Sequence, residues 1–276
     1  MAVSLVALRC RTADRFGGAP EGVEALAPLL ANALGVEARY VGTAGELRDT
    51  RYEEDLRDAR GCLLEAGGQI EDALAAGNVP VLLAADCSVS ATTLPAALRN
   101  RPEARVLWLD AHGDYNTPDT SGSGYLGGMC LAAATGEWDA GLGETVPAER
   151  VVLAGIRDLD PGERELLERS KATVIGASPV ETLVATKNAL DGAPIFVHFD
   201  TDVIDPEHFP AAVPAPGGLN PDKLYDLMDA VLEDCELLGL EVTNFAVPDD
   251  EEQRAVAIET AMHVLEPFLD HLAERE

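Results

Sequence analysis

Short apolar runs alternate along this chain with longer stretches in which apolar residues recur at helical spacing. The apolar runs predict strands at Val3–Leu8, Val36–Val41, Val79–Ala84, Val106–Leu109, Val151–Ile156, Thr173–Ile175, Pro194–Phe199 and Leu237–Val242. The intervening segments predict helices at Gly22–Leu34, Glu46–Ala76, Ser90–Arg99, Glu163–Ser170, Ser178–Leu190, Asp222–Leu232 and Asp249–Arg275. Strands that are apolar on both faces and alternate with helices are typical of a parallel sheet covered on both sides. The pattern therefore predicts an α/β fold, a three-layer α/β/α sandwich with a mostly parallel sheet of roughly eight strands.

The alternation runs without an intervening linker, repeat or low-complexity tract, so residues 1–276 are expected to form a single domain. Polar residues gather where several of the predicted strands end. These residues are Asp86, Cys87, Asp110, Asp158, Asp160, Asp200 and Glu241. Ligands of open parallel sheets collect beyond the carboxyl ends of the strands, so one shared cleft is expected there.

Two acidic motifs carry most of the chemical information. Asp110, His112 and Asp114 follow the apolar run Val106–Leu109, and Asp200 and Asp202 follow the run that ends at Phe199. If both motifs continue their strands, the alternate residues of each motif point the same way. Carboxylates and an imidazole directed at one spot would repel one another without cations, which indicates a two-metal site that generates hydroxide.

The overall charge narrows the choice of partners. The formal net charge is −29, which argues against nucleic acid and anionic membranes as partners. No apolar stretch is long enough to cross a bilayer, and the apolar run at residues 2–8 is too short for a secretory signal. The chain has five cysteines and no Cys-x-x-Cys pair, so a reducing cytoplasm is the expected location.

The motifs together resemble those of the arginase/agmatinase (ureohydrolase) family. In family order they are Ala85-Asp-Cys-Ser88, Asp110-Ala-His-Gly-Asp114, Ser123-Gly-Tyr-Leu-Gly-Gly128, Asp200-Thr-Asp-Val-Ile-Asp-Pro206 and Glu241-Val242. The resemblance covers most of the chain and implies a pair of Mn²⁺ ions. It implies that Asp110 and Asp200 bridge the metals, that Asp114 binds the first metal and orients the hydroxide, and that His112 and Asp202 bind the second metal.

The resemblance also implies the substrate contacts. Glu241 matches the glutamate that receives the guanidino group, a role that suits a carboxylate because a guanidine presents a planar fork of donors. Asp160 and Glu163 match contacts of the α-amino group in arginases, while Asn116 and Ser123 match contacts of the α-carboxylate. Agmatinases do not need this set, so an amino acid with the shape of arginine is the expected substrate.

Two departures from the family pattern are large. Cys87 and Gly127 stand where the family has histidines, a metal ligand and a proton shuttle respectively. Cys87 is read either as a small buried thiol or as a sixth protein ligand. In the second case the neighbouring dication would deprotonate the thiol and zinc, iron or cobalt would become conceivable beside manganese. His198 is interpreted as a packed and hydrogen-bonded core residue, as a hydrogen-bond donor to a metal ligand, or as a substitute proton carrier.

The same departures favour an Nω-hydroxylated substrate. The hydroxyl lowers the basicity of the guanidine, and the missing imidazole leaves room for the extra oxygen. The pair of changes resembles the branch of the family that serves D-cycloserine biosynthesis in actinomycetes. The sequence thus predicts hydrolysis of Nω-hydroxy-L-arginine to L-ornithine and hydroxyurea, with metal-generated hydroxide attacking the guanidino carbon and Asp114 passing its proton to the departing nitrogen.

Two alternatives to this prediction stay open. The first is an ordinary arginase or related ureohydrolase. The second, of another class, is a non-catalytic relative that binds arginine-like ligands. A homo-oligomer would be in keeping with the family, because arginases often form trimers or hexamers.

Overall fold

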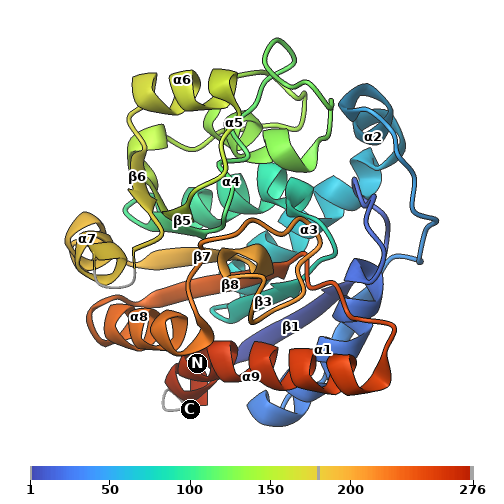
Figure 1. Cartoon of the computed structure of the whole chain (residues 1–276), viewed down its shortest axis with the longest axis vertical. Coiled ribbons are helices and arrows are strands. Elements are labelled where there is room, and N and C mark those ends of the chain that lie inside the picture. Colours follow the sequence, from blue (N-terminus) through green and yellow to red (C-terminus); the bar gives the residue numbers. More distant parts are fainter. Residues whose placement is uncertain (1, 179–180, 274–276) are drawn as a thin grey trace.

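The computed structural model of the protein describes residues 2–178 and 181–273. Within these ranges eight strands pair in parallel in one sheet, in the order β2-β1-β3-β8-β7-β4-β5-β6 (Figure 1). The strands are β1 Val3–Leu8, β2 Arg39–Val41, β3 Val79–Leu83, β4 Arg105–Leu109, β5 Val151–Ile156, β6 Thr173–Gly176, β7 Ile195–Asp200 and β8 Leu237–Thr243. The sequence predicted every one of them, although β2 is shorter than expected.

Helices cover both faces of this sheet. One face carries α1 (Ala19–Leu34), α7 (Glu181–Leu190), α8 (Pro221–Asp234) and α9 (Glu251–Ala273), whose buried side chains share one apolar core. The opposite face carries α3 (Arg60–Ala75), α4 (Ser90–Asn100), α5 (Cys130–Thr135) and α6 (Pro161–Arg169), which enclose a second core. Figure 1 shows the sheet between these two layers. The predicted three-layer α/β/α sandwich is therefore confirmed.

Alternation along the central strands decides which side chains can reach the site. Leu107 and Leu109 of β4 pack into the first core, whereas Trp108 packs into the second. In β7, Val197 and Phe199 face the first core. Side chains two apart share a face, so His198 lies on the same side as Trp108, toward α3 and α4. His198 is completely buried there.

The predicted helix Glu46–Ala76 was wrong as one element. Residues 46–51 are not helical, α2 spans only Tyr52–Asp58, and α3 begins at Arg60. The cause is tertiary, since the guanidinium of Arg11 binds the carbonyl of Arg48, the hydroxyl of Thr50 and the carboxylate of Asp55. A buried guanidinium needs several acceptors, and an extended segment supplies carbonyls that a helix would keep for itself.

Other boundaries differ less. The short helix α5 had not been predicted, because its six residues show too little periodicity. The predicted helices Ser178–Leu190 and Asp249–Arg275 correspond to α7 and α9. Positions 179–180 and 274–275 of those predictions lie outside the described residues.

A disulfide joins Cys10, just after β1, to Cys62 in α3, with their Cα atoms 6.1 Å apart. The sequence offered no reason to pair these two cysteines, which lie 52 residues apart. Such a cross-link is uncommon in a reducing cytoplasm, so its presence in the isolated protein is worth measuring. Among the described helices, none is both long enough and apolar enough to span a membrane.

Candidate metal centre and substrate cavity

The two acidic motifs adopt the same local geometry. The carboxylate of Asp110 accepts a hydrogen bond from the backbone N–H of His112 at 2.6 Å, and that of Asp200 accepts one from the N–H of Asp202 at 2.8 Å. β4 ends at Leu109, so the first motif lies in a turn and does not continue its strand as expected. Asp114 sits in the left-handed region at φ 47°. These turns still present the alternate side chains to a common site.

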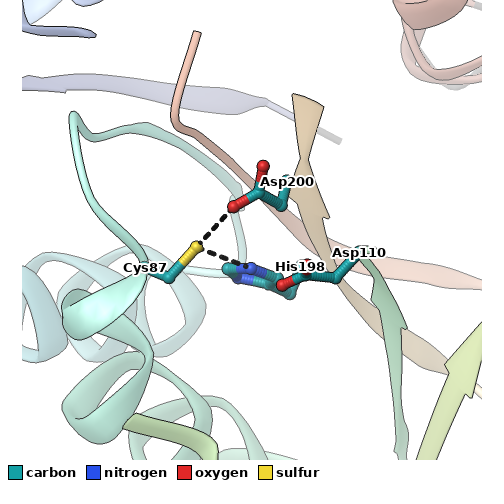
Figure 2. Close-up of side chains that lie close together, drawn as sticks. All are labelled: Cys87, Asp110, His198 and Asp200. Carbon is teal, nitrogen blue, oxygen red and sulfur yellow. Dashed lines mark hydrogen bonds between the residues drawn. The ribbon is translucent and has the colours of Figure 1, made fainter. Parts of the chain in front are cut away.

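Among the described residues, metal-ligating side chains form two adjoining groups. The Cys87 cluster consists of Cys87, Asp110, His198 and Asp200, and the His112 cluster consists of Asp110, His112 and Asp202. Within each cluster the candidate ligand atoms lie within 4.8 Å of one another, and Asp110 belongs to both. Figure 2 shows the Cys87 cluster, with the thiol directed at Asp200 and at the ring of His198.

The Cys87 cluster joins three of the central strands. Cys87 opens the 3₁₀ turn η1 (Cys87–Val89) after β3, Asp110 follows β4, and Asp200 ends β7. The thiol of Cys87 donates to Oδ2 of Asp200 at 2.8 Å, and the carboxamide of Asn244 donates to the same oxygen at 2.5 Å. Asn244 follows β8 and also has a positive φ, of 58°. The sequence motifs had not pointed to this residue.

The acids of the centre are crowded away from water. Burial raises the pKa of Asp110 and of Asp114 well above the usual range, and the neighbouring carboxylates add to the effect. Burial, followed by the charge of Asp202, raises the pKa of Asp200 to about 8. Burial alone would lower the pKa of His112, but Asp202 and Asp110 together raise it to about 12.

The pKa shifts indicate which kind of ligand these side chains would bind. Asp110, Asp114 and Asp200 favour their protonated forms because burial and neighbouring carboxylates disfavour their charges, whereas the imidazolium of His112 outweighs burial and lowers the pKa of Asp202. Divalent cations could replace those protons, and carboxylate, imidazole and thiolate are established metal ligands. The residues therefore fit a pair of divalent cations, one at each cluster. Asp114 lies in the adjoining cavity and belongs to neither cluster as defined by the 4.8 Å criterion.

A cavity of about 210 Å³ opens beside the two clusters. Its metal-proximal wall contains Cys87, His112, Asp114, Asp200 and Asp202. All four residues expected to hold the amino-acid end of the substrate also line it, namely Asn116, Ser123, Asp160 and Glu163. The structure thus gathers around one cavity the predicted metal ligands, apart from the fully enclosed Asp110, and the predicted amino-acid contacts.

Three of the residues predicted to hold the amino-acid end of the substrate are hydrogen-bonded to one another. Asn116 donates from Nδ2 to Asp160 at 3.1 Å, and Glu163 accepts from the backbone N–H groups of Tyr115 and Asp160. Asp160 and Glu163 form a capping box at the start of α6, which fixes both carboxylates. The carboxamide oxygen of Asn116 is buried and has no hydrogen-bond partner among the described residues, so it can accept one from a ligand.

Glu241, for which a contact with the guanidino group was predicted, lies in the predicted strand but not on the cavity wall. It is fully buried in β8 and is absent from the lining of the cavity. Its carboxylate accepts from Ser90 at 2.7 Å, from Thr93 at 2.6 Å and from Nδ1 of His198 at 2.8 Å. A contact with a guanidino group would require the cavity to open toward this buried carboxylate.

Tyr125 fills the space beside Gly127. A Cβ atom at position 127 would lie 2.5 Å from Cζ of Tyr125, which is far too close. The Tyr125 hydroxyl donates to Asp86, the ring lines the cavity, and Phe16 packs against it edge-on. The sequence signal for this arrangement was the missing side chain at Gly127, but the identity of the residue that fills the space was not readable.

An α/β sandwich that carries adjoining metal-ligand clusters at the carboxyl ends of its central strands defines a class of metal-dependent hydrolases that includes the arginases. The family profile described as Arginase family matches residues 32–267 of the chain. The chain therefore belongs to the arginase family, and it is a hydrolase of that family.

Individual relatives agree with this assignment. The Nω-hydroxy-L-arginine amidinohydrolase of Streptomyces lavendulae is 35% identical over 273 residues, which cover 99% of both chains. The arginase of Eremothecium gossypii is 32% identical over 248 residues, covering 82% of this chain and 61% of that one. The crystal structure of arginase from Bacillus subtilis superimposes with a TM-score of 0.85 at 22% identity over 98% of each chain, which supports the fold.

Proposed function

We propose that this protein hydrolyses Nω-hydroxy-L-arginine to L-ornithine and hydroxyurea, with two divalent cations, Mn²⁺ in the first instance. The observation that carries the proposal is the sharing of Asp110 between two ligand clusters beside a cavity lined by the residues predicted to bind the amino-acid end of the substrate. Similarity along 99% of its length to an enzyme named for this substrate supports the choice of substrate. We extend the proposal to a role in D-cycloserine biosynthesis, as expected from the resemblance.

The cations would be held by Cys87, Asp110 and Asp200 on one side and by Asp110, His112 and Asp202 on the other. When bound, paired divalent cations lower the pKa of water and so supply a nucleophile at neutral pH. Asp114 lines the cavity and its pKa is raised by burial, so it is suited to holding a proton at its carboxylate and releasing it to a leaving amine.

The opposite wall of the cavity would bind the amino-acid end. Asp160 offers a carboxylate for an α-ammonium group, and the second N–H of the Asn116 amide and the hydroxyl of Ser123 could donate to an α-carboxylate. The capping box and the hydrogen bond from Asn116 favour one position of Asp160 at the start of α6, so the ammonium site would be formed before the substrate arrives. Glu163 anchors this arrangement through two backbone N–H groups and contributes a further carboxylate to the wall.

The region around Tyr125 and Gly127 bears on the choice between hydroxyarginine and arginine. Tyr125 places an aromatic ring and a hydroxyl at the cavity wall, where a histidine at position 127 would not fit. An Nω-hydroxylated guanidine is less basic than a guanidine, so its hydrolysis depends less on a proton-carrying histidine. The missing shuttle therefore favours the hydroxylated substrate.

Turnover of both substrates by the metal-loaded enzyme tests the proposal. Purified protein supplied with Mn²⁺ should release L-ornithine from Nω-hydroxy-L-arginine with at least tenfold higher kcat/KM than from L-arginine, a difference of about 1.4 kcal/mol. Equal or faster turnover of L-arginine would identify an ordinary arginase. Fewer than one metal per chain, with no gain in activity on adding Mn²⁺, would support the non-catalytic alternative.

A further inference from the structure

We propose that His198 is an imidazole ligand of the cation at the Cys87 cluster and that Glu241 is the positioning residue that orients it. This inference rests on the proposed metal centre and deepens it. It gives Glu241 a role other than the substrate contact predicted from the resemblance. It also places a histidine at the first metal although position 87 has lost one.

The distance between the candidate donors fits coordination of one ion. Nε2 of His198 lies 3.4 Å from Sγ of Cys87. A sulfur at about 2.3 Å and a nitrogen at about 2.1 Å from one cation lie roughly 3.1 to 3.6 Å apart, for angles between octahedral and tetrahedral. The observed separation falls inside that interval. The carboxylates of Asp110 and Asp200 complete a set of four donors.

The orientation of the ring is fixed from its other nitrogen. Nδ1 of His198 lies 2.8 Å from Oε1 of Glu241, and the same carboxylate is held by Ser90 and Thr93. With Glu241 as a carboxylate, which can only accept, the 2.8 Å contact fits a proton on Nδ1 and a lone pair on Nε2 directed at the cluster. A histidine that binds a metal usually donates its other ring N–H to a carboxylate in this way.

Packing leaves the imidazole little freedom to adopt another pose. The ring stacks on Trp108 with centroids 3.6 Å apart and planes 9° apart, and His198 and Glu241 are both fully buried. The indole N–H of Trp108 donates to Asp110 at 3.0 Å, so the residue that supports the ring also fixes a neighbouring ligand. Burying a His–Glu pair costs free energy, because both side chains lose their contacts with water. Coordination of a metal by His198, with Glu241 holding the ring in place, gives a functional reason for burying this pair.

Cobalt binding to the metal-free protein provides a direct test. Histidines that bind paramagnetic Co²⁺ give strongly shifted ring-proton NMR signals. The wild-type protein with both clusters loaded should show two sets, one of which disappears in His198→Asn and the other in His112→Asn. Asparagine retains a donor near the position of Nδ1 but has no atom at that of Nε2. The control is His208→Asn, at an exposed loop position, which should keep both sets.

The possible outcomes separate the two proposals. If the fully loaded wild-type protein shows a single set of shifted ring-proton signals, and only His112→Asn removes it, the assignment of His198 is overturned and the metal centre remains intact. Failure of the wild-type protein to bind any Co²⁺ would overturn the metal centre and this inference with it. If His198→Asn does not fold, as judged by circular dichroism, the number of signal sets in the wild type still decides.

Glu241→Gln tests the positioning role. The variant should bind Co²⁺ at the Cys87 cluster about 10- to 100-fold more weakly, as is common when the partner of a metal-bound histidine is changed. At saturating metal, the KM of the variant for Nω-hydroxy-L-arginine should stay within twofold of the wild-type value. A large rise in KM with unchanged Co²⁺ affinity would instead assign Glu241 to the substrate and overturn its positioning role.

Discussion

The ring of Tyr125 occupies the space into which a side chain at Gly127 would project, with Cζ 2.5 Å from the ideal Cβ position. Gly128, the next residue in the same 3₁₀ turn, has no contact closer than 4.0 Å at its own Cβ position. The two glycines therefore form a matched pair that differs in the space available. The absence of a histidine at position 127 and the placement of the Tyr125 ring are therefore linked, because the ring occupies the space that a side chain at position 127 would need.

Gly127→Ala should lower the free energy of unfolding by about 1 to 3 kcal/mol, the usual cost of overpacking a buried site. Gly128→Ala should change it by less than about 0.5 kcal/mol, since it adds a methyl group in open space. Urea unfolding of both variants measures the difference. In a Tyr125→Ala background the extra cost of Gly127→Ala should vanish. If that cost persists, Tyr125 is not the obstacle.

Cys87 should bind metal as a thiolate. Burial raises the pKa of this thiol well above its ordinary value, and the charge of Asp200 adds to the effect, so the free thiol stays protonated until a dication displaces the proton. Loading the metal-free protein with Co²⁺ should therefore produce a sulfur-to-cobalt charge-transfer band in the near ultraviolet. Cys87→Ser should lack the band. Cys130→Ser, which alters another buried cysteine near Asp114, should retain it.

The disulfide between Cys10 and Cys62 should contribute about 4 kcal/mol to stability on the chain-entropy model, for the loop of 52 residues that it closes. Urea unfolding with and without a reductant measures this contribution. Thiol titration in denaturant should find three free thiols per chain in the oxidised protein, those of Cys87, Cys130 and Cys235. Five thiols in protein purified without reductant would contradict the cross-link.

Glu163 should make the stability of the metal-free protein depend on pH. Burial raises the pKa of this carboxyl from its ordinary 4.5 to about 7. As pH rises through that window the unfolded chain loses its proton first, so the native state loses stability, by up to roughly 3 kcal/mol. Glu163→Gln carries no such proton, so its stability relative to the wild type should improve steadily between pH 4.5 and 7.

The matched control for this experiment is Glu165→Gln, an exposed position on the same helix. Glu163→Gln should also show a constant loss at every pH, because the amide replaces one acceptor of the hydrogen bonds from Tyr115 and Asp160. The test is therefore how the stability difference between Glu163→Gln and the wild type changes with pH, and not the size of that difference at one pH. Parallel stability curves for the Glu163→Gln and wild-type proteins would rule out the raised pKa.

The sheet could be predicted from the sequence because its signal is local. Each central strand is buried on both faces, so a short apolar run suffices to identify it, as Val79–Leu83 and Ile195–Phe199 show. The acidic motifs directly follow such runs, which placed Asp110 and Asp200 at one edge before any strand order was known. The predicted helix from Glu46 was wrong because Arg11, a residue far away in the chain, binds the carbonyl of Arg48 and the side chains of Thr50 and Asp55.

The sequence by itself determined the class of fold, the family and most of the candidate metal ligands. The reason is that the burial pattern of a strand and the spacing of a motif can both be read from a short stretch of consecutive residues. Only the tertiary structure decided that β3, β8, β7 and β4 are neighbours, and hence that Cys87, His198 and Glu241 meet in one network. It also decided that Tyr125 fills the space beside Gly127 and that Cys10 pairs with Cys62. The physical reason is that such contacts join residues far apart in the chain, and their partners are fixed by the packing of the whole molecule.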